Sequence, residues 1–245
     1  MPNAATIGSK DAPVVTIVTV VRNAVDEIED TLKSVAALKT PAVEYVVMDG
    51  GSTDGTVDLI RKYAGQIDHW VSQPDAGIYD AMNRALPLAH GDYVLNMNAG
   101  DRLLALPIKA LASQPDSVAA VCGEVETEDG RVRPRWDRSI RRHNTLPHQG
   151  CFYRRTTLLR HPYDLRRRVF ADYDLNLSLY AEGCDVRLLP LVVAFHSVRG
   201  VSNDSRHARE LFDIIRSHCG NRARWQAWLY FKIQGLKSRW QKQGF

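Results

Sequence analysis

The 245-residue sequence lacks several features that would assign it to a simple class of protein. It has no apolar run long enough to cross a bilayer, because the longest early run, residues 13–21, is interrupted by two threonines. Its four cysteines stand 29, 33 and 35 residues apart without a C-x-x-C pair. We therefore expect reduced thiols, with neither a zinc ribbon nor a disulfide framework. We also expect no signal peptide and no transmembrane helix, and hence a cytoplasmic location.

Two nucleotide-binding signatures are missing as well. Residues 21–24 (VRNA) follow the first predicted strand where a dinucleotide-binding fold would carry G-x-G-x-x-G, and no G-x-x-x-x-G-K-[ST] occurs anywhere. There is no internal repeat and no low-complexity segment. With 44% hydrophobic and 24% charged residues, the composition fits one globular domain with a modest extension.

The charges are strongly partitioned along the chain. The net charge of +4 is the balance of −10 over residues 1–130, +10 over 131–170, −3 over 171–204 and +7 over 205–245. An acidic first half suits the handling of a metal ion or of hydroxyl groups. The two basic segments suit phosphate groups, nucleic acid or an anionic membrane surface.

The hydrophobic pattern predicts an α/β fold with a largely parallel sheet. Short β-branched runs alternate with helical patterns through the first half, as in β-α-β units. The predicted strands are 14–21, 44–48, 67–71, 93–97, 118–121 and 150–154. The predicted helices are 24–38, a stretch from 56, 78–89, 172–181, 205–217 and 222–241. Residues 126–135 suggest a hairpin, and the basic residues 138–146 suggest a mobile loop.

Carboxylates follow three of the predicted strands. Asp49, Asp75 and Asp101 each stand just after a strand, at the sheet edge where ligands bind in open α/β sheets. Such loops would converge on a divalent cation or on sugar hydroxyls. Asp54 is different, because it directly precedes a helical pattern and reads as a helix cap.

Four consecutive motifs resemble those of glycosyltransferase family 2. They are residues 17–23 (IVTVVRN), 47–56 (VMDGGSTDGT), 73–83 (QPDAGIYDAMN) and 98–101 (NAGD). The resemblance is specific over residues 14–105 and extends more weakly to 204 through His148-Gln149 and Asp172.

The resemblance implies a GT-A type fold, a Rossmann-like mixed sheet flanked by helices, and an inverting sugar transfer from a nucleotide-diphosphate sugar, most often a UDP-sugar. Residues 1–105 would bind the donor and 106–204 the acceptor, together forming a catalytic domain of residues 1–204. Residues 205–245 would be a helical extension. The donor site would be formed by Thr19, Val21, Arg22, Asn23, Asp49, Gly51, Asp75, Asn83, Asn98, His148 and Gln149.

By the same resemblance, Asp101 would hold Mg²⁺ or Mn²⁺. His196 could be a further metal ligand or donate to the diphosphate, because a neutral imidazole can coordinate a metal near pH 7. Many relatives carry two adjacent acids here, whereas this chain has Gly100 before Asp101. Asp172 would be the base that deprotonates the acceptor hydroxyl, with Asp174 as the second choice. Either carboxylate could instead serve the start of a helix.

The basic segments leave alternatives open. Arg138, Arg141 and Arg142 could close over the diphosphate or could be solvated surface charge. Residues 222–245 carry tryptophans flanked by basic residues, so they could lie on the inner face of the cytoplasmic membrane or pack on the domain. A membrane position agrees with a glycan or polyprenyl-diphosphate-linked acceptor in bacterial polysaccharide synthesis. The rival functions are an inactive GT-A scaffold, a nucleotidyltransferase and a nucleic-acid-binding protein; we expect no nucleic acid partner.

Overall fold

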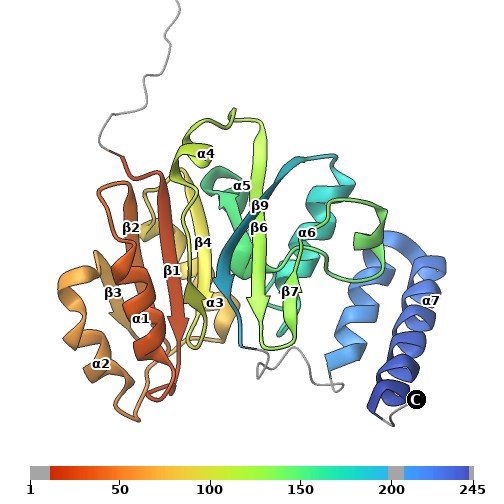
Figure 1. Cartoon of the computed structure of the whole chain (residues 1–245), viewed down its shortest axis with the longest axis horizontal. Helices are drawn as coiled ribbons and strands as arrows, with labels where there is room; N and C mark the ends of the chain where they lie inside the picture. The colour runs from red at the N-terminus through yellow and green to blue at the C-terminus, as the bar shows by residue number, and fades with distance from the viewer. Residues whose placement is uncertain (1–11, 198–206, 243–245) are drawn as a thin grey trace, which may run out of the picture.

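A mixed nine-stranded sheet forms the centre of the computed structural model, which describes residues 12–197 and 207–242 (Figure 1). The strand order is β3-β2-β1-β4-β8-β6-β9-β5, and β7 pairs with β6. The strands are β1 (Val15–Val21), β2 (Val43–Asp49), β3 (His69–Ser72), β4 (Tyr93–Asn98), β5 (Arg102–Leu103), β6 (Val118–Thr127), β7 (Gly130–Val132), β8 (Cys151–Arg154) and β9 (Asp185–Phe195). The first four strands in this order are parallel, so β1 to β4 end at one common edge.

The helices cover both faces of the sheet. They are α1 (Ile28–Ala37), α2 (Thr56–Lys62), α3 (Ile78–Ala85), α4 (Ile108–Ala112), α5 (Arg155–Arg160), α6 (Ala171–Ala181) and α7 (Ala208–Lys242). Four short 3₁₀ helices are η1 (Ala64–Gln66), η2 (Leu86–Leu88), η3 (Arg138–Arg141) and η4 (His148–Gly150). None of the helices in the described part of the chain is long and apolar enough to span a membrane.

The core lies in two layers that the strand alternation separates. Val18 and Val20 of β1 belong to the layer under α3, α5 and α6, whereas Ile17 and Val21 belong to the layer under α1, α2 and α4. Successive side chains of a strand point to opposite faces, so a strand covered on both faces reads as a continuous apolar run. The predicted mixed α/β fold is thus confirmed, with β6 longer and α1 and α3 shorter than the sequence pattern predicts.

The C-terminal helix packs against the domain mainly through its first segment, and Ala227 of the second segment is buried in the same cluster. It contains a break at Gly220, whose φ of 80° lies in the left-handed region, so two helical segments stand side by side at one end of the molecule (Figure 1). Leu211, Ile214 and Ile215 are buried together with Tyr173 of α6. The two predicted C-terminal helices therefore form, but the first is part of the core.

Two expectations from the sequence are wrong. Residues 138–146 are not a mobile loop, because they include η3 and the fully buried Ile140 and Leu146. The cysteines are not all reduced: Cys122 of β6 and Cys151 of β8 are disulfide-bonded, and Cys184 and Cys219 are free. The bonded pair occupies opposite positions on neighbouring antiparallel strands with Cα atoms 4.1 Å apart. Such a pairing depends on the strand order, which the spacing of 29 residues does not reveal.

Candidate functional site

The carboxyl ends of β1 and β2 are joined by a dense set of hydrogen bonds around Asp49. This buried carboxylate accepts hydrogen bonds from the backbone amides of Gly51 and Ser52 at 3.1 and 3.0 Å and from the hydroxyl of Ser72 at 2.6 Å. Asn23 holds the facing loop, since its Oδ1 accepts from the Thr53 amide at 2.9 Å. Asp49 therefore shapes the loop after β2 from beneath.

Asp54 is not the N-cap of α2 that the sequence predicts, because Gly55 takes that position, but its side chain binds the first residue of the helix. Its Oδ1 accepts hydrogen bonds from the amide of Thr56 at 3.0 Å and from the Thr56 hydroxyl at 2.6 Å. These bonds, the hydroxyl contact foremost, lower the pKa of Asp54. The side chain serves the helix terminus and the neighbouring loop.

Asp75 packs closely against Gly50 in the loop after β2. Its Oδ1 accepts a hydrogen bond from the Gly77 amide at 2.9 Å, which fixes the carboxylate. A Cβ atom on Gly50 would lie 2.5 Å from Asp75 Oδ2 and 3.3 Å from the Cβ of Arg22. The Arg22 side chain is exposed and has no ion-pair partner among the described residues. The absence of a side chain at position 50 thus lets the Asp75 carboxylate lie directly against the loop after β2, beside the Cβ atom of Arg22.

Asp101 and His196 lie together at the carboxyl ends of β4 and β9. The His196 Nδ1 atom is 2.6 Å from Asp101 Oδ1 and 2.8 Å from Gln149 Nε2. Asp101 Oδ2 accepts a hydrogen bond from the Asn98 amide at 2.9 Å, and Asp101 is only 2% exposed. Gly100 has a φ of 93°, so a second acid at this position would be strained, which accounts for the lone carboxylate.

Asp172, at the second position of α6, faces the same edge. Its Oδ1 accepts a hydrogen bond from the Tyr79 hydroxyl at 3.1 Å, and its Oδ2 accepts one from Asn144 Nδ2 at 3.0 Å. The His148 Nδ1 atom lies 3.6 Å from Oδ2. The helix N-cap is Phe170, so the Asp172 side chain is directed into the site and does not cap its own helix.

The electrostatics of the site centre on His148. Burial lowers the pKa of its imidazole, but the hydrogen bond to Asp172 and the charges of Asp172 and Asp101 outweigh burial and raise the pKa above 6.5. The other ring nitrogen, Nε2, is 3.2 Å from Asn98 Nδ2. His148 therefore connects the carboxylate of Asp172 with the strand end that carries Asp101.

The predicted site residues fall into two sets. The larger set gathers at the edge where β1, β2, β4 and β9 end, with Asn23 and the backbone of Val21 beside it. Its members are Arg22, Asp49, Gly51, Asp75, Asn98, Asp101, His148, Gln149, Asp172 and His196. Two side chains are committed elsewhere. Thr19 is fully buried, with its hydroxyl 3.0 Å from the Tyr45 hydroxyl, and Asn83 is bonded twice to the backbone of Tyr163.

Asp174, the second choice for the base, and the arginines expected near the diphosphate contact other side chains in the structure. Asp174 Oδ1 is 3.0 Å from His218 Nε2 of α7, so this carboxylate joins two helices. Arg141 lies over the ring of Tyr180 and Arg142 over that of Tyr230, at 5.6 and 5.8 Å from the ring centroids. These arginines stand beside α7 in the structure.

Three residues of the site escaped the reading of the sequence. Tyr79 occupies an apolar position of α3 and gave no polar signal, while Asn144 stands in the segment expected to be a loop. Glu210 of α7 accepts hydrogen bonds from the amides of Arg168, Val169 and Phe170 at 3.0, 3.0 and 2.8 Å, just before α6. Of the three, only Tyr79 lies inside one of the four family motifs, that of residues 73–83, and this position was the one available clue.

Comparison with known proteins gives three findings. The family model described as Glycosyl transferase family 2 matches residues 16–171. A PGL/p-HBAD biosynthesis glycosyltransferase of Mycobacterium tuberculosis is 34% identical over 212 residues, which cover 78% of this chain and 80% of that protein.

Among solved structures, Staphylococcus aureus TarS 1–349 in complex with UDP is similar with a TM-score of 0.65 and 19% identity, over 83% of this chain and 64% of that chain. Glucosyl-3-phosphoglycerate synthase from M. tuberculosis, in complex with Mn²⁺, UDP and glucosyl-3-phosphoglycerate, is similar with a TM-score of 0.61 and 17% identity, over 85% of this chain and 80% of that chain. At these identities, the likeness establishes the GT-A fold.

Proposed function

The chain belongs to glycosyl transferase family 2, and we propose from that premise that it moves a sugar, with inversion, from a nucleotide-diphosphate sugar to a hydroxyl group of a glycan or lipid-linked acceptor. One observation carries the proposal. Contacts within hydrogen-bond or ion-pair distance run from His196 and Asp101 through the Asn98 backbone amide to the Asn98 side chain, and from there through His148 to Asp172. A group for the donor diphosphate and a base for the acceptor thus share one edge of the sheet.

The donor is a UDP-sugar in this proposal. The TarS structure and the glucosyl-3-phosphoglycerate synthase structure each contain UDP. In this chain the nucleotide would lie beside the loop after β2, where Asp75 packs against Gly50 and the Arg22 side chain is exposed. Carboxylates accept hydrogen bonds from base and ribose groups, and a free guanidinium suits phosphate.

A divalent cation, Mg²⁺ or Mn²⁺, fits the end of β4. Asn98 Oδ1 is buried without a hydrogen-bond partner among the described residues, next to the carboxylate of Asp101. Two oxygen ligands together with phosphate oxygens suit such an ion. When bound, the cation would neutralise charge on the leaving diphosphate. His196 would be a further ligand through Nδ1, and the cation would then replace the direct hydrogen bond between that atom and Asp101.

Asp172 is the base in this proposal. Tyr79 and Asn144 hold its two oxygens in place, and the residue is only 8% exposed. A carboxylate with a fixed orientation and little water around it is suited to take the proton of an acceptor hydroxyl as that oxygen attacks the anomeric carbon. The inactive-scaffold and nucleotidyltransferase alternatives give no role to this arrangement.

The acceptor is a phosphate-bearing lipid in this proposal, reached at the inner face of the cytoplasmic membrane. A cavity of 660 Å³ lies between the segment 138–142 and α7. Arg138, Arg141, Arg142 and Arg222 line it together with Leu229, Tyr230 and Ile233, so its wall is both cationic and apolar. The segment leads directly to Asn144 and so to Asp172. Trp225 and Trp228, 61% and 46% exposed, suit an adjoining lipid interface.

The first experiment is calorimetric titration of the full chain with UDP, GDP and dTDP, with and without Mn²⁺, beside Asp101→Ala. We expect one nucleotide, UDP, to bind more tightly with Mn²⁺, and the gain from Mn²⁺ to vanish in the variant. Transfer from a matching sugar donor to a polyprenyl-diphosphate-linked acceptor is then measured. If no nucleotide binds in any condition, the proposal is wrong and the scaffold alternative stands.

A further inference from the structure

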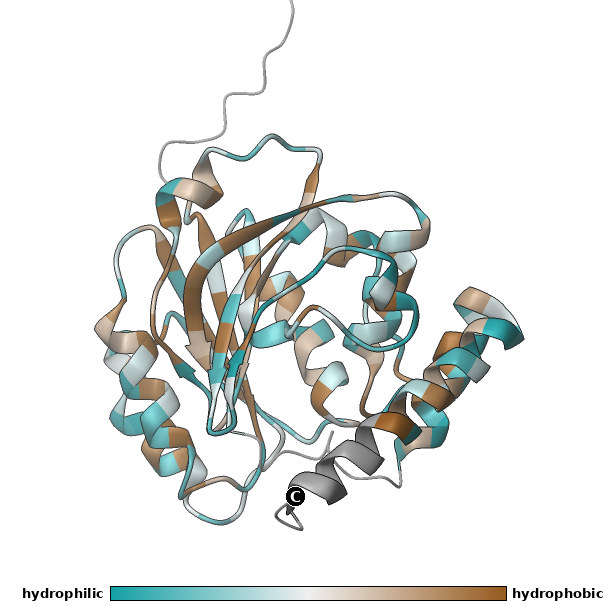
Figure 2. Cartoon of the chain, turned by 45° about the vertical axis from the view of Figure 1, so that its right-hand side comes forward, coloured by the Kyte–Doolittle hydropathy of each residue, from teal (hydrophilic) through white to brown (hydrophobic). Residues whose placement is uncertain are grey.

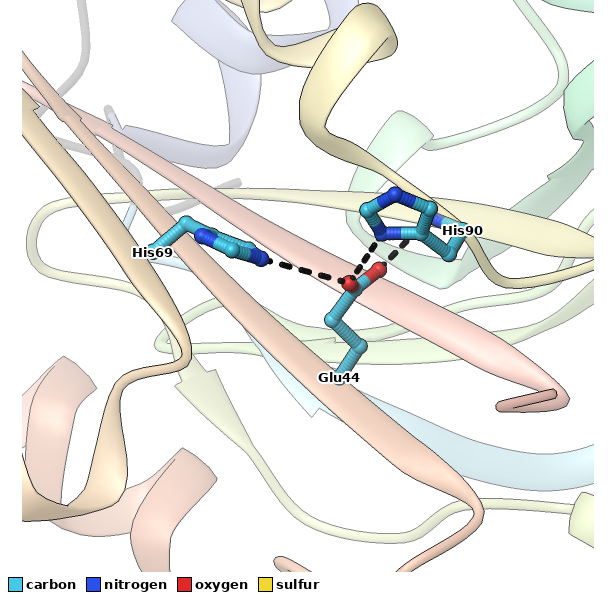
Figure 3. A group of neighbouring side chains, drawn as sticks. All are labelled: Glu44, His69 and His90. Atoms are coloured by element: carbon cyan, nitrogen blue, oxygen red, sulfur yellow. Dashed lines mark hydrogen bonds and ion pairs between the residues drawn. The ribbon is translucent and has the colours of Figure 1, made fainter. Parts of the chain in front are cut away.

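Glu44, His69 and His90 form a cluster at the edge of the sheet opposite the candidate active site (Figure 3). Glu44 is the second residue of β2, His69 is the first of β3, and His90 stands in the turn before β4. The His90 Nδ1 atom is 2.7 Å from Glu44 Oε1, and the His69 Nε2 atom is 3.9 Å from the same oxygen. Figure 3 shows both rings turned toward this carboxylate.

The cluster is separate from the nucleotide-sugar site. Glu44 and Asp49 mark the two ends of the same strand, five residues apart. At about 3.3 Å per residue, this separation is about 16 Å along β2. A ligand of the cluster therefore does not touch Asp101 or the loop after β2.

The Glu44 carboxylate is held in one orientation by neighbouring donors. Its Oε2 accepts a hydrogen bond from the Thr16 hydroxyl at 2.6 Å and one from the His90 amide at 2.7 Å. The Thr16 hydroxyl in turn accepts from the Gly91 amide at 2.9 Å. Gly91 must be glycine, because a Cβ there would lie 2.5 Å from the Thr16 nitrogen.

This support leaves Oε1 for the two imidazoles. The residue is only 7% exposed, and its Oε2 is occupied by the Thr16 hydroxyl and the His90 amide. A buried carboxylate with its second oxygen occupied by fixed donors is a typical supported metal ligand.

We propose that Glu44, His69 and His90 bind a zinc-class divalent transition-metal ion. Two imidazoles and one carboxylate are a ligand set that such ions favour, whereas Mg²⁺ prefers oxygen ligands throughout. Zinc bonds of about 2.0–2.2 Å in tetrahedral geometry place ligand atoms about 3.3 Å apart, between the 2.7 and 3.9 Å of the cluster. The two imidazoles are 60% and 46% exposed, which leaves a side open for water and for entry of the ion.

The ion would fasten the edge of the sheet. β3 is the terminal strand of the sheet and has four residues, and the three ligands come from β2, β3 and the turn before β4. Because a ligand that binds only the folded state stabilises it, Zn²⁺ raises the melting temperature. This inference is independent of the proposed transferase function.

The test uses the full chain, stripped with a chelator and titrated with Zn²⁺ by calorimetry and in thermal melts. We expect one Zn²⁺ per chain at this site, with the affinity at least tenfold weaker in His69→Ala and in His90→Ala. The matched control is His161→Ala, because His161 Nε2 pairs with Glu182 at 3.4 Å without a third ligand. The control keeps the Zn²⁺ affinity and the rise in melting temperature.

Two results decide against the proposal. If the wild-type chain binds no Zn²⁺, Glu44 and His90 form only a structural hydrogen bond. If both cluster variants bind Zn²⁺ as tightly as the wild type, the ion sits elsewhere, and Asp101→Ala identifies whether it uses the end of β4. Visible absorption of Co²⁺ in place of Zn²⁺ reports the coordination geometry and is lost in the two cluster variants.

Discussion

The Nδ1 atom of His148 lies 3.6 Å from Oδ2 of Asp172, and both side chains are largely buried. This contact joins η4, which precedes β8, to the first turn of α6, so two segments that are distant in the sequence meet at the end of β4. The carboxylate that would take a proton is therefore held beside a titratable base, and its charge helps to raise the pKa of His148.

Asp172→Asn tests the proposed base. The amide keeps the size of the side chain and can accept the Tyr79 hydrogen bond, but it cannot take a proton. We expect kcat to fall by about 10²- to 10⁴-fold while UDP affinity stays unchanged. Asp174→Asn is the control, because Asp174 contacts His218 of α7, and it should keep kcat within a few fold. Equal losses in both variants would point to folding and not to proton transfer.

The raised pKa of His148 predicts a pH-dependent stability. A group whose folded pKa is raised stabilises the fold fully below its unfolded pKa near 6.5, and this contribution is lost as pH rises through the folded value. Denaturation of the wild type and His148→Gln across this window should show the difference shrink with rising pH. In Asp172→Asn, NMR titration should place the pKa of His148 below 6.5, because burial then dominates. A difference that grows with pH contradicts the sign.

Gly50→Ala tests the space proposed for the nucleotide. The added Cβ would meet Asp75 Oδ2 at 2.5 Å, which is the end of a side chain and can be displaced. We expect UDP to bind at least about fivefold more weakly, while the melting temperature changes little. Gly65→Ala adds a methyl group with no atom within 4 Å and serves as the control. Unchanged UDP affinity in Gly50→Ala would place the nucleotide away from Asp75.

Glu210→Gln tests whether α7 supports the active site. The Glu210 carboxylate accepts three backbone hydrogen bonds immediately before α6, two residues from Asp172. Losing the charge should lower the free energy of unfolding by about 1–3 kcal/mol, and kcat should fall with it. Arg209→Ala is the neighbouring control, since its contact to Asp213 is exposed and 3.9 Å long. If the unfolding free energy is unaffected, the Glu210 carboxylate does not support the segment before α6, and α7 is held by its apolar contacts alone.

Most of the fold and the edge of the site could be read from the sequence, because these depend on local patterns. Periodicity located the parallel strands, and the position of Asp49 and Asp101 after strands β2 and β4 put them at a common edge. The failures concern contacts between distant segments. The Cys122–Cys151 pairing needs the order of β6 and β8, and residues 138–146 are packed because α7 covers Ile140. Glu210 was invisible for the same reason.

The segment of α7 after Gly220 carries exposed tryptophans, and we expect it to give the chain a measurable affinity for anionic membranes. Figure 2 shows hydrophobic and hydrophilic positions side by side along this helix, and Trp225 and Trp228 are exposed although a core position was an alternative for them. Trp240 belongs to the same predicted aromatic pattern, but its side chain is not among those that the structure describes.

Binding of the chain to vesicles with anionic lipids should therefore weaken at least about tenfold in the double variant Trp225→Ser/Trp228→Ser, because each indole removed takes away apolar area that the interface would bury. It should also weaken with added salt, since the Lys232 ammonium, 4.7 Å from the centroid of the Trp228 ring, and the neighbouring Arg224 would interact with lipid charge over a short screening length. Leu159→Ser/Leu165→Ser is the matched control, because both leucines are about half exposed on another part of the surface. Equal binding of all three proteins would show that the exposed tryptophans do not bind the membrane. A protein partner would then be the better explanation of their exposure, and the proposal that the acceptor is reached at a membrane would be wrong.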